Sequence, residues 1–97
     1  MKNRPDALIV TDDLVAFGAV KLFESINFSI PEEIVVASFN NSILSRYSNT
    51  PLTSVDINAV ELGRQSMNLL IEAMELGITG KKTIIPYTNH KRKSTEG

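Results

Sequence analysis

The sequence contains no cysteine and only one histidine among its 97 residues. Disulfides and thiolate metal sites are therefore excluded, and one histidine without a cysteine gives no reason to expect a metal or another cofactor. No apolar run approaches the roughly 20 residues that a membrane-spanning helix needs. We expect a protein of the cytoplasm with no membrane partner, no metal site and no cofactor.

An excess of either charge is also missing, since ten Lys and Arg oppose eleven Asp and Glu. This balance argues against a surface devoted to nucleic acid. The basic run His90–Lys93 has no interleaved aromatic residue, so we interpret it as a solvated tail and His90 as a surface residue. A hydrophobic fraction of 42% indicates a globular unit, although a chain this short forms only a marginal core.

The first forty residues read as strand, helix, strand. The stretch 7–10 is apolar throughout, which is typical of a strand buried on both faces in a parallel sheet. Apolar residues then recur at helical spacing over 14–26, with Thr11 or Asp12 able to cap the start. A second apolar stretch covers 34–39. Together they predict a βαβ unit with parallel strands.

The rest of the chain predicts a second helix. Asn58 and Glu61 have the spacing of a capping box, and Gly77 lies where a left-handed residue ends a helix. The other expected elements are a loop over 42–51, a short extended piece over 52–55 and a last strand over 83–87. A doubly wound sheet normally has more strands on both flanks, so the chain looks like a piece of a larger α/β domain.

A set of short motifs, in order and with regular spacing, resembles the lactose-repressor family of bacterial transcription regulators. The motifs are Pro5-Asp6-Ala7, Asp12-Asp13, Ala16, Gly18-Ala19, Pro31–Ile34, Val35–Asn41, Pro51–Val55, Leu62-Gly63 and Arg92–Thr95. They cover nearly the whole chain. The letters SFNNS followed by PLTSVDI are further similar to maltose-operon repressors.

The resemblance implies a periplasmic-binding-protein-like (type I) α/β sensor with a parallel sheet, of which this chain is a part. Residues 1–56 would be the βαβ unit of the C-terminal subdomain with a dimer-type loop. Residues 57–78 would cross to the N-terminal subdomain, and 79–97 would hold the return strand and the basic tail. In this interpretation the DNA-binding headpiece and the first half of the sensor are absent.

Three residues are candidates for contact with a sugar effector. By resemblance, Asp12 and Asn40 match effector-contacting positions, and Ala59 matches a pocket-facing position on the crossing helix. Asp13 and Asn58 are expected to cap helices. The simpler readings are that Asp12 is also only a cap and that Asn40 only forms a turn. Asn in place of the family's Asp keeps a donor and an acceptor but loses the charge.

The resemblance also implies a homodimer. Phe17, Ile43, Leu44 and Tyr47 align with dimer-forming elements, although core packing is the ordinary role for any single such Phe. Operator DNA would be bound only through the missing headpiece.

Two other functions compete with the regulator. A phosphoryl-receiver domain would use Asp12, Asp13 and Asp56 around Mg²⁺, but the strand before Asp56 is short and breaks at Pro51. A sugar-binding protein of a transport system is the second alternative. No nucleophile elbow and no glycine-rich phosphate loop is present, so we do not expect an enzyme.

Overall fold

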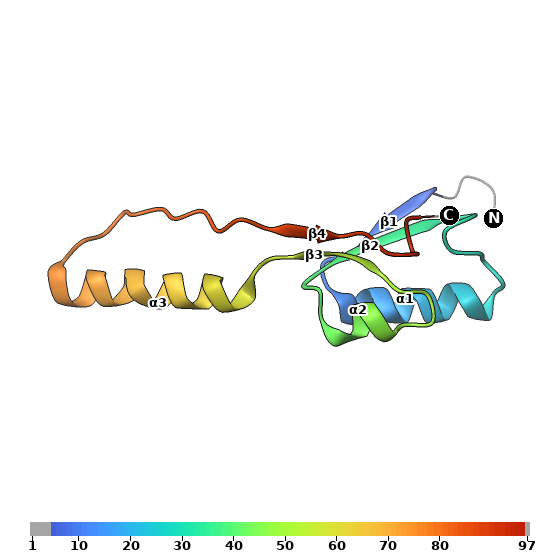
Figure 1. Ribbon diagram of the computed structural model, residues 1–97, viewed down its shortest axis with the longest axis horizontal. Helices are drawn as coiled ribbons and strands as arrows, with labels where there is room; N and C mark the ends of the chain where they lie inside the picture. Colours follow the sequence, from blue (N-terminus) through green and yellow to red (C-terminus); the bar gives the residue numbers. More distant parts are fainter. Residues whose placement is uncertain (1–4, 97) are drawn as a thin grey trace.

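The computed structural model describes residues 5–96, which form an elongated molecule of 57 × 28 × 19 Å. Two parts are visible in Figure 1: a lobe, made of residues 5–56 and 88–96, and an arm, made of residues 57–87. The elements are β1 (Ala7–Ile9), α1 (Asp13–Ser25), β2 (Val35–Phe39), α2 (Ile43–Tyr47), β3 (Thr53–Asp56), α3 (Ala59–Leu76) and β4 (Thr88–His90).

The predicted βαβ unit is confirmed. Strand β1 pairs in parallel with β2, placing Leu8 opposite Val36, and β2 pairs in parallel with β3. Strand β4 then joins β3 in the antiparallel sense, which gives the sheet order β1-β2-β3-β4. The fold is therefore a mixed sheet with a parallel core, in the α/β class that the sequence predicted.

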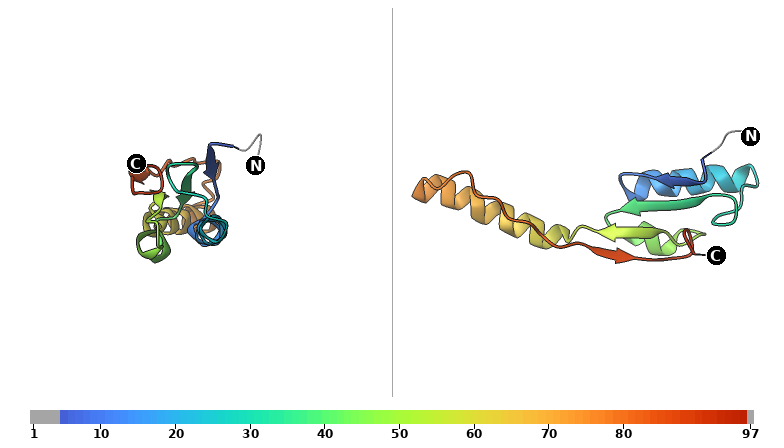
Figure 2. Two further views of the ribbon diagram at one scale, coloured as in Figure 1. Left: turned by 90° about the vertical axis from the view of Figure 1, so that its right-hand side faces the viewer. Right: turned by 90° about the horizontal axis from the view of Figure 1, so that it is seen from above.

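Helices α1 and α2 lie on the same face of the sheet (Figures 1 and 2). The core lies between this face and α1, and consists of Ala16, Val20, Ile30, Ile34, Val36 and Leu52. In the described chain no helix covers the opposite face, and Ile9 remains 71% exposed. The expectation that 7–10 is a strand buried on both faces is therefore wrong, since β1 lies at the sheet edge with one face bare.

We expected the segment 42–51 to be a loop. The structure shows that it also contains the short helix α2. The helix packs beside α1 and carries the buried Ser45, whose hydroxyl donates to the Ser42 carbonyl at 2.7 Å. A five-residue helix with two serines around it lacks the apolar periodicity by which a helix is recognised.

The last strand is β4, not the predicted 83–87. Thr88 pairs with Asp56 and His90 with Ser54, so the strand forms where the chain returns to the lobe. Residues 83–87 run beside α3, away from the sheet, and therefore have no strand to pair with (Figure 1).

Helix α3 projects away from the lobe, and none of its residues is buried. It ends at Gly77 in the left-handed conformation (φ 67°), as predicted. Asn58 does stand at the N-cap position, but it has a left-handed backbone (φ 59°) and its side chain makes no capping hydrogen bond. The capping box is therefore wrong. Glu61 instead contacts Arg64 and Gln65, one turn further along the helix.

The segment after β4 is built into the lobe, so the expected solvated tail is wrong for part of its length. Ser94 is fully buried. Its carbonyl accepts from the Val36 amide at 3.0 Å, and its own amide donates to the Pro51 carbonyl at 2.9 Å. Its hydroxyl donates to the Val36 carbonyl and accepts from the Thr53 amide. Ser94 thus fills the gap in the ladder between β2 and the later start of β3.

Candidate functional site

Three parallel strands end at one edge of the sheet, and the candidate effector residues follow their ends. Asp12 follows β1, Asn40 follows β2 and Ala59 follows β3. Because the strands are parallel neighbours in register, the chain leaves the sheet at the same edge each time. We call Asp12, Asn40 and Ala59 the rim. Asn40 and Ala59 are exposed, and Asp12 is half-buried.

Asp12, and not Asp13, caps α1. One carboxylate oxygen of Asp12 accepts from the amides of Leu14 at 2.8 Å and Val15 at 3.0 Å. These amides have no partner inside the helix, so the side chain satisfies them and places negative charge at the positive end of the helix dipole. The cap uses only one of the two oxygens. Capping and ligand contact are therefore compatible at Asp12.

Asp13 is a buried carboxylate, 1% exposed, that holds three segments together. It accepts hydrogen bonds from the hydroxyls of Ser38 and Ser54 and from the Ser42 amide. Burial alone would raise its pKa, but the hydrogen bonds from these three serines outweigh that effect and hold the pKa below its usual value. Asp13 therefore remains a structural residue, as predicted, but its role as helix cap is wrong.

Asn40 and Asn41 both have a left-handed backbone, with φ of 98° and 48°. The Asn40 amide donates to the Val55 carbonyl at 2.8 Å, which fixes its place beside β3. Within residues 5–96 its side chain makes no hydrogen bond, and it stays exposed at the rim. The Asn40 side chain is thus free to act as both donor and acceptor toward a ligand.

Asn41, in contrast, is fully engaged with the lobe. Its amide donates to the Ser54 hydroxyl at 2.8 Å, and its side-chain amide donates to the Asp56 carboxylate at 3.3 Å. Its side-chain oxygen accepts from the Arg92 guanidinium at 2.6 Å and from Ser45 at 3.4 Å. Sequence reasoning missed this role, which only the folded arrangement of Asn41 beside β3 and Arg92 reveals.

Arg92 is the second residue that sequence reasoning missed. Besides Asn41, its guanidinium donates to the Leu52 carbonyl at 2.8 Å and to the Ser45 hydroxyl at 3.0 Å. The planar fork of an arginine suits three acceptors spread over two segments better than the point charge of a lysine. Its place in the closing motif Arg92–Thr95 was the only signal that could have identified it.

The Asp56 carboxylate lies where the lobe meets the arm. It accepts from the Asn58 amide at 2.8 Å and from Asn41, and one oxygen is 3.8 Å from the His90 ring. The Asn58 and Asn41 hydrogen bonds, together with electrostatic attraction from His90 and Arg46, lower its pKa. His90 is therefore half-buried at this junction and not simply a surface residue.

The three aspartates do not gather into the acidic site of a phosphoryl receiver. Asp12 caps α1, Asp13 is enclosed by serines, and Asp56 is held by Asn58 and Asn41. No group of three or more potential metal-binding side chains is found in residues 5–96. In the same range no helix is long and apolar enough to cross a bilayer.

The predicted dimer residues lie on the two neighbouring helices α1 and α2. Ile43 is 70% exposed and Tyr47 77% exposed, whereas Leu44 and Phe17 are half-buried. The ammonium of Lys21 lies 5.4 Å from the centre of the Phe17 ring. Phe17 is outside the buried core, so one side of α1 and α2 offers apolar surface.

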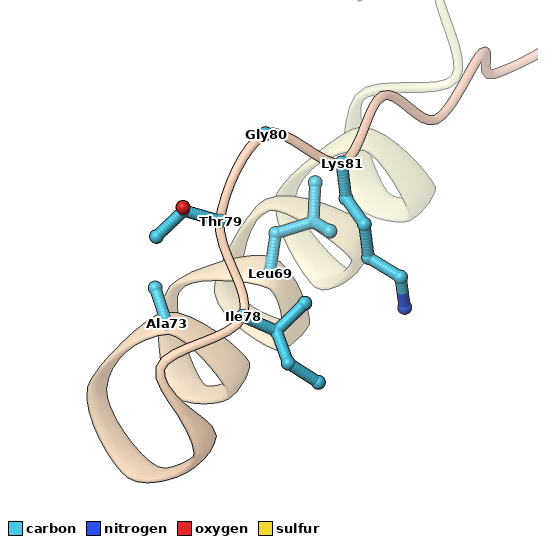
Figure 3. A pocket seen from close by; sticks show the side chains of 6 residues that line it. All are labelled: Leu69, Ala73, Ile78, Thr79, Gly80 and Lys81. Carbon is cyan, nitrogen blue, oxygen red and sulfur yellow. The ribbon is translucent and has the colours of Figure 1, made fainter.

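A hollow occurs far from the rim, on the arm (Figure 3). It lies between Leu69 and Ala73 of α3 and the segment 78–81 that turns back over the helix. Lys81 closes one side and binds Glu72 at 2.9 Å.

The chain is similar to bacterial transcription regulators. A family model described as a periplasmic binding protein-like domain matches residues 1–95. The NTD biosynthesis operon regulator of Bacillus subtilis (strain 168) is 31% identical over 85 residues, covering 88% of this chain. The chain spans about a quarter of the length of that relative, 26%.

Solved structures agree in fold. A transcriptional regulator LacI from Bacillus cereus subsp. cytotoxis NVH 391-98 has a TM-score of 0.91 and 33% identity, over 100% of this chain and 35% of its own. A maltose operon transcriptional repressor from Staphylococcus aureus has a TM-score of 0.85 and 26% identity, over 99% of this chain and 34% of its own.

Proposed function

The chain belongs to the periplasmic binding protein-like domain family, and on that basis we propose that it senses a sugar effector as part of a transcriptional repressor. Membership of the lactose-repressor type, predicted from the motifs, is confirmed by the regulators that match the chain. Residues 1–56 would be the βαβ unit of the C-terminal subdomain with a dimer-type loop, residues 57–78 would cross to the other subdomain and residues 79–97 would return. The headpiece that reads DNA would belong to the rest of the repressor.

One observation carries this proposal: Asp12 and Asn40 follow neighbouring parallel strands at one sheet edge, and both have polar atoms to spare. In open α/β sheets, ligands bind in the crevice beyond the carboxyl ends of the strands. Asp12 has one carboxylate oxygen that the helix cap does not use, and Asn40 has both the oxygen and the NH₂ group of its side-chain amide available. Such groups suit the paired hydroxyls of a saccharide. Ala59 is small and leaves room for a bulky one.

The mechanism would be a shift between two closure states. A sugar held between two subdomains prefers one angle of closure, and that preference biases the DNA-binding part of a dimer. We propose that Phe17, Ile43, Leu44 and Tyr47 form the dimer surface, because α1 and α2 expose apolar residues side by side. The matched relatives are regulators and not enzymes, which supports a binding role without catalysis.

The test is a titration of the ¹⁵N-labelled chain with maltose and a panel of other saccharides, followed by NMR. We expect shifts at the amides of Asp12, Asn40 and Ala59. The affinity should be weaker than about 1 mM, or roughly −4 kcal/mol, because one wall of the cleft is missing. Asn40→Gly should abolish the rim shifts, since glycine keeps the left-handed backbone while removing the amide.

Asn27→Gly is the matched control for this titration. Asn27 is also exposed and left-handed (φ 60°), but it lies at the far end of α1. It should leave the rim shifts intact. If no saccharide moves a rim amide, or if Asn27→Gly weakens the shifts as much as Asn40→Gly, the proposed effector site is wrong. A dissociation constant in the micromolar range would contradict the interpretation that this chain supplies only one wall of the effector cleft.

A separate measurement tests the DNA role. We expect no sequence-specific retention of operator DNA by this chain in a gel-shift assay. Arg92 of the basic run already donates hydrogen bonds to Asn41 and Leu52. Specific retention at physiological salt would show that the chain reads DNA by itself and would overturn this part of the proposal.

A further inference from the structure

We propose that Asp56 and Asn41 form a latch that sets the angle of the arm against the lobe and links that angle to the rim. The Asp56 carboxylate accepts the Asn58 amide at the start of the arm with one oxygen and the Asn41 side chain with the other. Asn41 directly follows Asn40 of the rim. A movement of the rim loop is thereby passed to the arm through two hydrogen bonds.

Within residues 5–96, packing does not fix the direction of the arm. No residue of α3 is buried, and the arm meets the lobe through the narrow ribbon of β3 and β4 (Figures 1 and 2). Asn58, the residue at this bend, has a left-handed backbone, and its amide is held by Asp56. The bend is therefore set by a local hydrogen bond to a side chain of the lobe and not by a shared core.

Several hydrogen bonds hold the lobe end of the latch, which is Asn41. Asn41 is held by the Ser54 hydroxyl through its amide and by Arg92 through its side-chain oxygen. These contacts orient its side-chain nitrogen toward Asp56. The titratable and charged groups that face the carboxylate are His90 on β4 and Arg46 on α2. The latch thus joins Asn41, which is hydrogen-bonded to the lobe at two further points, to Asn58 at the start of the arm.

The chemistry of the pair offers a sharp test, because donor and acceptor can be exchanged. Asp56→Asn leaves one of the two contacts without an acceptor, and Asn41→Asp places two carboxylates against each other. The double variant Asn41→Asp with Asp56→Asn restores a donor opposite an acceptor. An aspartate at 41 still accepts from Arg92, an asparagine at 56 still accepts from Asn58, and the net charge is that of the original chain.

The experiment measures the distance between lobe and arm by pulsed electron paramagnetic resonance. The chain has no cysteine, so Gly18→Cys on α1 and Asn68→Cys on α3 give two unique label sites. A side chain at Gly18 meets open space. A second pair, Gly18→Cys with Glu32→Cys, lies within the lobe and reports whether the lobe stays folded.

We expect each single variant to broaden the lobe-to-arm distance distribution and the exchanged pair to restore it. Glu75→Gln, which removes an exposed carboxylate of the arm, should leave the distribution unchanged. The distribution within the lobe should be unaltered throughout. The proposal is overturned if Asp56→Asn leaves the lobe-to-arm distances unchanged, if the exchange does not restore them, or if the distances within the lobe change to the same degree. No ligand is used, so the result is independent of the proposed effector.

Discussion

Replacing Asp13 by Asn should be among the most damaging single-atom changes in the lobe. The variant keeps the shape of the side chain and one carbonyl oxygen for Ser38 and Ser54. Its new NH₂ group would face the Ser42 amide, so that two donors meet. Because this happens at a site that is 1% exposed, no water can replace the lost acceptor without a rearrangement.

The size of the effect follows from these three contacts. Two hydrogen bonds to a charged acceptor become neutral ones, and a third leaves a buried donor unsatisfied. Relief of the buried charge offsets part of this. We expect a loss of about 2 to 4 kcal/mol in the free energy of unfolding. For a domain of this length, that corresponds to a fall in Tm on the order of 10 to 20 °C.

Urea unfolding followed by far-ultraviolet circular dichroism is the assay. The midpoint should fall in Asp13→Asn while the slope with denaturant is retained. Asp6→Asn is the matched control, since Asp6 is an exposed carboxylate of the same lobe, and it should stay within about 0.5 kcal/mol of the original chain. A loss below about 0.5 kcal/mol in Asp13→Asn would refute the reasoning.

The pH dependence supplies an independent check of the same residue. The pKa of Asp13 is lower in the folded chain than its usual value, so the folded state favours the ionised form. Its contribution is therefore complete above the unfolded pKa of about 3.9 and is lost as pH falls through the folded pKa. The difference in stability between the original chain and Asp13→Asn should shrink below about pH 4. If this difference in stability grows as the pH falls, the direction given for the pKa of Asp13 is wrong.

Three further predictions test the closing segment and the arm. Ser94→Ala should lower the free energy of unfolding by about 1 to 3 kcal/mol in urea melts, because the Thr53 amide loses its buried acceptor. Arg92→Lys should be destabilising by urea unfolding although the charge is kept, and a result equal to the original chain would show that the fork is not needed. Gly77→Ala should strain the left-handed helix end by about 1 kcal/mol and speed amide exchange in the last turn of α3 roughly fivefold, leaving exchange in the lobe unchanged.

The local patterns that predicted the fold were those whose physical cause is local. Apolar runs indicated β1 and β2, and the helical spacing between them indicated α1, because burial of one face acts on neighbouring residues. Gly77 was predicted correctly, since a left-handed helix end has a steric preference that the residue carries with it. The family motifs added the prediction that the rim residues contact an effector.

The features that the sequence did not predict depend on distant partners. Asp13 finds its serines 25 and 41 residues further along the chain, and nothing beside it signals a buried carboxylate. Ser94 looks like part of a polar tail, yet the late start of β3 opens a gap in the ladder that it fills. The last strand formed at 88–90 because its pairing partner, β3, lies in the lobe and not beside the arm.

The adjacent pairs Asp12-Asp13 and Asn40-Asn41 share one arrangement, which leaves the rim accessible while anchoring it to the lobe. Each pair follows a parallel strand of the sheet. The first member of each pair stays at the rim, and the second is held inside the lobe by serines or by Arg92. Because Asn40 and Asn41 are joined by one peptide, the hydrogen bonds of Asn41 anchor Asn40 to the lobe. The hydrogen bonds of Asn41 thus connect the rim to Ser54 and Arg92 in the lobe and to the Asp56 carboxylate at the start of the arm.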